Sequence, residues 1–91
     1  MNNSRYRLRT DIVFRKEGEE SFLFDPETGR VRILNETGTM IYQRLMRNLS
    51  RVEIIDSIIA EYDSVNREDL EGDLDEFTAQ MEQSGILELV R

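Results

Sequence analysis

The feature that most constrains this chain is a change in hydrophobic periodicity between Arg30 and Gly38. Before Asn35, apolar residues alternate with polar ones, which is the pattern of a half-buried strand. After Asn35, apolar residues recur every three or four positions, which is the pattern of an amphipathic helix. Asn35 is a good N-cap, and Glu36 suits the positive end of the helix dipole. The chain must pass from a strand into a helix here, which predicts a mixed fold.

Composition indicates one small soluble domain. The chain has 91 residues, of which 38% are hydrophobic and 34% are charged. It contains no cysteine, which excludes disulfides and thiolate metal sites and fits a cytoplasmic location. No apolar run approaches the ~20 residues that span a bilayer, and no apolar segment of a secretory signal follows the N-terminal arginines. We therefore expect no membrane partner.

Three strand patterns precede Asn35, at residues 12–16, 21–25 and 30–34, and residues 1–10 are expected to be flexible. Pro26 and Gly29 form a strong turn signal, so Asp25 should face Arg30 in a hairpin. A loop at residues 17–19 would place Lys16 opposite Glu20. In this register six apolar side chains share one face of the sheet, namely Ile12, Phe14, Phe22, Phe24, Val31 and Ile33.

Three helix patterns follow the strands, at residues 36–47, 51–62 and 66–84. Ser50 and Glu53 form a capping box before the second helix, and Gly85 suits the stop of the third. Residues 86–90 form a short apolar tail that should dock on the body of the protein as a strand. The order of elements predicts an α+β fold that resembles a winged helix-turn-helix, with residues 11–91 as one domain.

Charge is unevenly distributed along the chain. Residues 1–35 hold 7 basic and 6 acidic side chains, whereas residues 36–91 hold 5 basic and 13 acidic ones. The predicted third helix, residues 66–84, holds seven acidic side chains and one basic one. Because contact with phosphates requires Lys and Arg, such a chain is a poor ligand for nucleic acid. We expect protein or peptide partners instead.

The residue types that support catalysis are scarce. The chain has no histidine and no cysteine, so the commonest general base and the best thiol nucleophile are absent. The acidic run at residues 73–76 lacks the glycine and the ligand spacing of a calcium-binding loop. The sequence therefore predicts a protein that is not an enzyme and that holds no metal or cofactor.

Several short motifs together resemble a known family. The turn Asp25-Pro26-x-x-Gly29 is followed by Leu34-Asn35-x-Thr37-Gly38-x-x-Ile41-Tyr42, by Ile54-Ile55 and Tyr62, and by a final Gly85-Ile86-Leu87. In this order and spacing, over roughly residues 5–90, the motifs are similar to those of the PqqD-like proteins, which are also called RiPP recognition elements.

This resemblance implies a winged-helix-like domain without enzymatic activity. Such domains bind the leader segment of a ribosomally made precursor peptide. The leader adds as a further strand to the open edge of the third strand, in a groove walled by the third helix. The domain then presents the peptide to a modifying enzyme, often a radical SAM enzyme.

The residues themselves fit this mechanism, because a free strand edge offers unpaired backbone groups to an added strand. Arg30 and Arg32 fit an exposed edge, although they equally suit edge protection alone. We hypothesise that the acidic row of the third helix faces the peptide and favours basic leader residues; such a row is otherwise a solvated face. The apolar stripe of this helix serves as core, as groove or as both. The candidate peptide-binding residues are Arg30, Val31, Arg32, Ile33, Leu34, Asp69, Leu70, Asp73, Leu74, Glu76 and Phe77.

Two other functions are compatible with the pattern. A DNA-binding winged helix has the same order of helices, but phosphates would repel an acidic recognition helix. A scaffold subunit would pair with a second copy through the same strand edge, so that both a monomer and a homodimer remain open.

Overall fold

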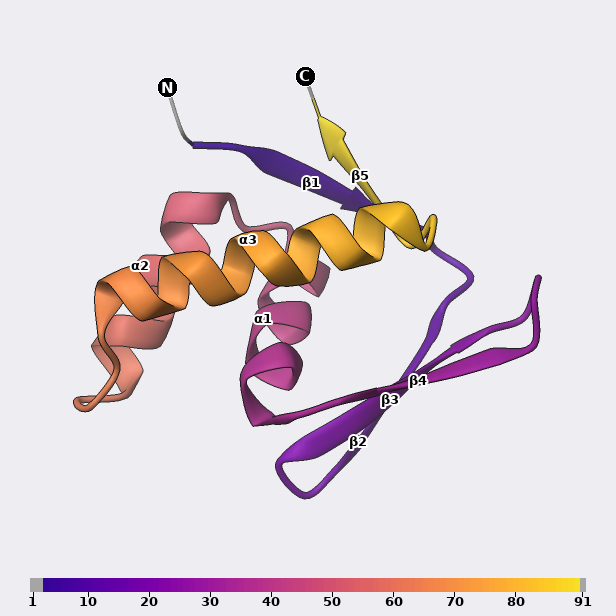
Figure 1. Cartoon of the computed structure of the whole chain (residues 1–91), viewed down its shortest axis with the longest axis horizontal. Helices are drawn as coiled ribbons and strands as arrows, with labels where there is room; N and C mark the ends of the chain where they lie inside the picture. The colour runs from indigo at the N-terminus through magenta and orange to yellow at the C-terminus, as the bar shows by residue number, and fades with distance from the viewer. Residues whose placement is uncertain (1–2, 91) are drawn as a thin grey trace.

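The computed structural model describes residues 3–90 and contains two small sheets and three helices (Figure 1). The strands β2, β3 and β4 form an antiparallel sheet in that order, and β1 pairs with β5. The expected α+β fold, with three helices after three strands and a short C-terminal strand, is confirmed. The elements are β1 (Arg5–Leu8), β2 (Val13–Glu17), β3 (Glu20–Asp25), β4 (Arg30–Leu34), α1 (Glu36–Met46), α2 (Arg51–Glu61), α3 (Arg67–Gln83) and β5 (Leu87–Val90).

The strand β1 differs from the expectation that residues 1–10 are flexible. It pairs antiparallel with β5, so that Tyr6 lies opposite Leu89 and the first and last strands lie side by side (Figure 1). Tyr6 is buried, whereas Arg5 and Arg7 point outward. Arginines alternate with apolar residues in this strand, and the apolar residues Tyr6 and Leu8 point inward and pack in or against the core. Residues 1, 2 and 91 of the expected segments lie outside the described residues.

The hairpin of β3 and β4 has the predicted register. Asp25 lies opposite Arg30, and Phe22 lies opposite Ile33. Gly29 adopts a φ of 75°, and its N–H donates to the Asp25 carbonyl at 2.8 Å. Because glycine takes this left-handed conformation without steric cost, the turn fixes the register locally.

The hairpin of β2 and β3 is displaced by one residue from the predicted register. Phe14 lies opposite Leu23, and not opposite Phe22. The physical reason is the turn, which contains two residues, Gly18 and Glu19, where a loop of three was expected. Gly18 has a φ of 65°, and a glycine at the first position of a two-residue hairpin turn is favoured for this reason.

The displaced register changes which side chains share the helix-covered face of the sheet. The Ser21 hydroxyl lies 2.7 Å from the Thr39 hydroxyl of α1, and the Phe14 ring stacks on Tyr42 with centroids 5.4 Å apart. Leu23 on this face is 1% exposed. The prediction of six apolar side chains on one face is therefore wrong. The opposite, open face presents Val13, Phe24, Val31 and Ile33.

Local capping fixes the helix starts, as the sequence predicts. The Asn35 side chain accepts from the Gly38 N–H at 2.8 Å at the start of α1. Ser50 and Glu53 form both hydrogen bonds of the capping box of α2. The Asn66 side chain caps α3. Each cap satisfies N–H groups of a first turn that no intrahelical carbonyl reaches.

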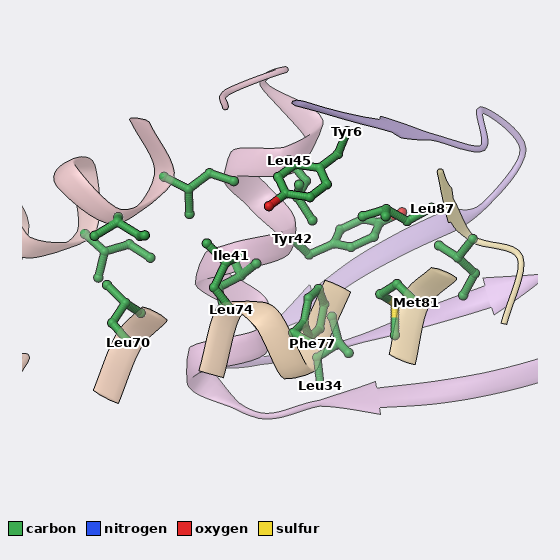
Figure 2. Packing of buried hydrophobic residues seen from close by; sticks show 14 of the residues in the cluster. Tyr6, Leu34, Ile41, Tyr42, Leu45, Leu70, Leu74, Phe77, Met81 and Leu87 are labelled. Carbon is green, nitrogen blue, oxygen red and sulfur yellow. The ribbon is translucent and has the colours of Figure 1, made fainter. Parts of the chain in front are cut away.

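The core lies between the three helices, the covered sheet face and the small β1–β5 sheet (Figure 2). The apolar stripe of α3 is buried over its whole length, and Leu74 in its middle is 0% exposed. This stripe is therefore core, and Phe77 lies at its boundary with 9% exposure. No helix among residues 3–90 is long and apolar enough to cross a membrane.

One arginine ties the connection between the two sheets to the end of β3. The Arg9 guanidinium donates to both Asp25 oxygens at 3.0 Å and to both Asp11 oxygens at 3.0 and 2.8 Å. The Glu27 N–H also donates to Asp25, at 2.9 Å. The Arg9 hydrogen bonds hold the pKa of the Asp25 carboxyl below its usual value. A lowered pKa means that protonation of this carboxyl opposes folding.

The buried face of the sheet can be tested with a matched pair of substitutions. Leu23→Ala should lower the free energy of unfolding by about 2–5 kcal/mol, because it leaves a cavity against the helices. Val13→Ala, on the open face, should change it by less than about 0.5 kcal/mol. Urea unfolding followed by circular dichroism measures both values. Similar losses in the two variants would contradict the described register.

The Arg9–Asp25 contact predicts a pH dependence of stability. Because the pKa of Asp25 is lowered in the folded state, its contribution is complete above about pH 4 and disappears as the pH falls through the folded value. Asp25→Asn should therefore destabilise the protein at pH 7 and reduce the loss of stability between about pH 4 and pH 2. Thermal unfolding across this range tests it, and parallel curves for the two proteins would refute the role of Asp25.

Candidate functional site

One edge of β4 is unpaired. β4 pairs with β3 on its other side, and β5, which could have closed the edge, pairs with β1. Within residues 3–90, no strand occupies the outer side of β4. A free strand edge presents N–H and C=O groups to an extended segment from another molecule.

A groove of about 460 Å³ lies between β4 and α3. Its lining includes Leu34, Ile41, Phe77 and Met81, all of them buried residues of the core. Figure 2 shows Phe77 of α3 next to Leu34 of β4. A Cβ atom at Gly38 would lie 3.3 Å from the Phe77 ring, so glycine allows α1 and α3 to approach closely here. The groove thus has an apolar floor beside the open strand edge.

Charged side chains form the rim of the groove. Asp73 and Glu76 of α3 and Glu20, the first residue of β3, lie on it, and all three are exposed. Arg32 of β4 lines the groove from the opposite wall and is half-buried. The rim therefore combines several carboxylates with one cation.

Two smaller hollows extend the groove along α3. One of about 200 Å³ is lined by Asp69, Leu70 and Asp73, and it shares Asp73 with the groove. The other, of about 330 Å³, is lined by Arg30 and Arg32 and by the end of α3, and it shares Arg32 with the groove. Together they form a trough that follows α3 from its first turns to its end.

Most of the predicted site residues meet in this trough. Arg32, Ile33, Leu34, Asp73, Glu76 and Phe77 line the groove, and Arg30, Asp69 and Leu70 line the neighbouring hollows. Val31 and Leu74 line none of the three. Val31 is 61% exposed on the open face of the sheet, whereas Leu74 is wholly buried. These two residues therefore lie outside the trough, whereas Leu34 and Met81 contribute to the apolar floor of the groove.

Several lining residues were not among the predicted ones, namely Glu20, Asn35, Thr37, Gly38, Ile41, Gln80 and Met81. Gln80 continues the row of Asp73 and Glu76 by one helical turn, so the helical period alone would have found it. Ile41 lies on the inward arc of α1. Glu20 had no such signal, because the two-residue turn of the β2–β3 hairpin brings it to the rim.

The chemistry of the groove suits binding. Among residues 3–90, no group of three acidic, histidine or cysteine side chains could hold a metal ion. The groove offers the free backbone groups of β4, an apolar floor and charged side chains on its rim. An extended peptide needs these three features from its receptor.

Comparison with known proteins places this geometry in context. The chain matches the family described as Coenzyme PQQ synthesis protein D (PqqD) over residues 20–87. A solved structure described as TbiB1 in complex with the TbiA(beta) leader peptide has 30% sequence identity and a TM-score of 0.80, covering 90% of this chain and 94% of that one. A second, lasso peptide synthetase B1 complexed with the leader peptide, has 28% identity and a TM-score of 0.77, covering 91% and 96%. No curated protein matches the sequence.

Proposed function

Because the chain belongs to the PqqD family, we propose that it binds the leader segment of a ribosomally synthesised precursor peptide and presents it to a modifying enzyme. The observation that carries the proposal is the unpaired edge of β4 beside the groove. The two solved structures of similar fold, which hold leader peptides, support it.

Strand addition to β4 accounts for affinity without strict sequence demands. Each backbone hydrogen bond that an added strand forms contributes about 0.5–1.5 kcal/mol, whatever the side chains are. Antiparallel addition is favoured, since its pairs are slightly more stable per residue than parallel ones. Alternate side chains of the peptide would then enter the groove, and those between them would lie beside Val31 and Ile33 on the open face.

The groove supplies selectivity. Leu34 and Phe77 would receive an apolar side chain of the leader. Asp69, Asp73 and Glu76 would favour basic leader residues, because they are exposed along the trough. Such contacts are screened by salt, so the selectivity should weaken as ionic strength rises.

Chemistry on the peptide belongs to a partner protein. The chain has no histidine and no cysteine, and we propose that it acts as a peptide-binding chaperone and is not itself an enzyme. The family resemblance favours a radical SAM enzyme as the partner, acting in the cytoplasm where precursor peptides are made. A monomer and a homodimer are both compatible with the free edge, since a second copy would compete with the leader for it.

DNA binding is the less favoured function. α3 is the helix that would serve as the recognition helix of a DNA-binding winged-helix protein. Residues 66–84, which include it, hold seven acidic side chains and one basic one. Phosphates would be repelled by such a helix. The similar solved structures hold peptides.

Leader binding can be mapped by NMR. The leader of a precursor encoded beside this gene should shift the amide resonances of residues 30–34 and of the groove side of α3, since backbone pairing changes their hydrogen bonds. The amide resonances of β1 and β5 serve as the internal control, and their chemical shifts should not change. Binding that leaves residues 30–34 unshifted would contradict strand addition to β4.

The acidic row can be tested by charge reversal. Asp73→Lys or Glu76→Lys should weaken binding of a basic leader roughly three- to tenfold in low salt, because an attraction becomes a repulsion. Glu82→Lys makes the same charge change on the opposite flank of α3 and should bind as the unchanged protein does. Isothermal titration calorimetry measures the three dissociation constants. Unchanged affinity for the leader in Asp73→Lys and Glu76→Lys would contradict the proposal that the acidic row contacts basic leader residues.

A further inference from the structure

The two flanks of α3 differ in how their carboxylates are paired. On the far flank, which faces away from the groove, the Asp75 carboxylate accepts from Arg51 at 3.0 Å, and the Glu71 carboxylate lies 3.6 Å from the Arg67 guanidinium. On the groove flank, no cation within residues 3–90 lies within 4.0 Å of Asp73 or Glu76. Within the described residues, the protein pairs Asp75 and Glu71 of the far flank with its own arginines and leaves Asp73 and Glu76 unpaired along the groove.

The opposite charge stands at the other end of the trough. The Arg32 guanidinium donates to the Ser84 hydroxyl at the C-terminal cap of α3. The negative end of the helix dipole favours a cation at this place. No carboxylate in the described part of the chain forms an ion pair with Arg32 or Arg30, and Asp25, which faces Arg30 across the hairpin, gives both its oxygens to Arg9. Arg32 is thus a positioned cation with N–H groups left for a ligand.

The order of these charges along β4 is fixed. Arg30 and Arg32 come first and lie by the end of α3, whereas Leu34 comes last and lies by Asp73 and Glu76. An antiparallel peptide would place its N-terminal part beside Leu34 and its C-terminal part beside Arg30. Because side chains alternate between the two faces, the peptide residues that enter the trough are two positions apart.

We infer that the trough selects leaders by the order of their charges: a basic residue, an apolar residue and an acidic residue, two positions apart in this direction. The basic residue meets Asp73 and Glu76, the apolar one lies over Phe77 and Leu34, and the acidic one meets Arg32. This inference rests on the proposed function and adds to it a direction and a charge pattern. The same composition in the reverse order would place like charges together at both ends.

Two synthetic peptides of identical composition test the inference. The first is acetyl-Thr-Lys-Val-Leu-Val-Asp-Thr-amide, and the second exchanges its Lys and Asp. The first should bind about tenfold more tightly in low salt, because two attractions replace two repulsions, and the ratio should approach one in about 1 M NaCl. Amide shifts of the full chain during titration give both dissociation constants.

Neutral variants assign the effect to the named residues. Asp73→Asn and Arg32→Gln keep the shape of each side chain approximately, and Gln still offers a donor to Ser84. Each should reduce the ratio of the two dissociation constants about threefold. Glu82→Gln and Arg47→Gln remove the same charges away from the trough and should leave the ratio unchanged.

The outcomes separate the two proposals. If both peptides bind equally and both shift residues 30–34, the selection by charge order is wrong and strand addition stands. A ratio that survives in Asp73→Asn and Arg32→Gln also overturns the inference. If neither peptide shifts residues 30–34 although the precursor leader does, the charge pattern fails and strand addition stands; if the leader does not shift them either, strand addition fails as well.

Discussion

The pairing of β1 with β5 is the contact on which the candidate site depends. It commits the C-terminal strand to the N-terminus, with Leu8 opposite Leu87, and the Arg9 N–H extends the ladder to the Ile86 carbonyl at 2.9 Å. Tyr6 and Leu87 are buried by it. Had the C-terminal strand joined β4 instead, it would have satisfied the backbone groups that an incoming peptide needs. A free strand edge can pair with another copy of the same chain, and Arg30 and Arg32 on β4 discourage such pairing.

Sequence reasoning succeeded where the determinants are local. The Asn35 cap, the capping box at Ser50 and the Pro26–Gly29 turn each depend on a few neighbouring residues, and all three were predictable. It failed where the length of a turn, changed by one residue, determines which face of a whole strand is buried. Gly18 is compatible with turns of two or three residues, and the choice between them exchanges the two faces of β2. β1 was missed for another reason, because its partner lies at the far end of the chain.

The candidate site shows the same division. The open edge of β4 and the acidic row of α3 follow from strand and helix periods, and most residues named from them line the trough. Which apolar residues form the floor depends on tertiary packing. Val31 faces outward because Ser21 and Leu23, on the other face of the sheet, contact the helices. α3 serves two purposes at once, since its apolar stripe holds the core together while the row beside it stays charged.

Hydrogen exchange at the edge of β4 is the most direct measurement, because it reads the backbone groups that strand addition would engage. In the free protein, amides of residues 30–34 that point away from β3 should exchange rapidly, as unpaired groups do. With a saturating leader peptide, the same amides should become protected, while the already paired amides of β3 change little. A leader that binds tightly without protecting any amide of residues 30–34 would show that the peptide is held elsewhere.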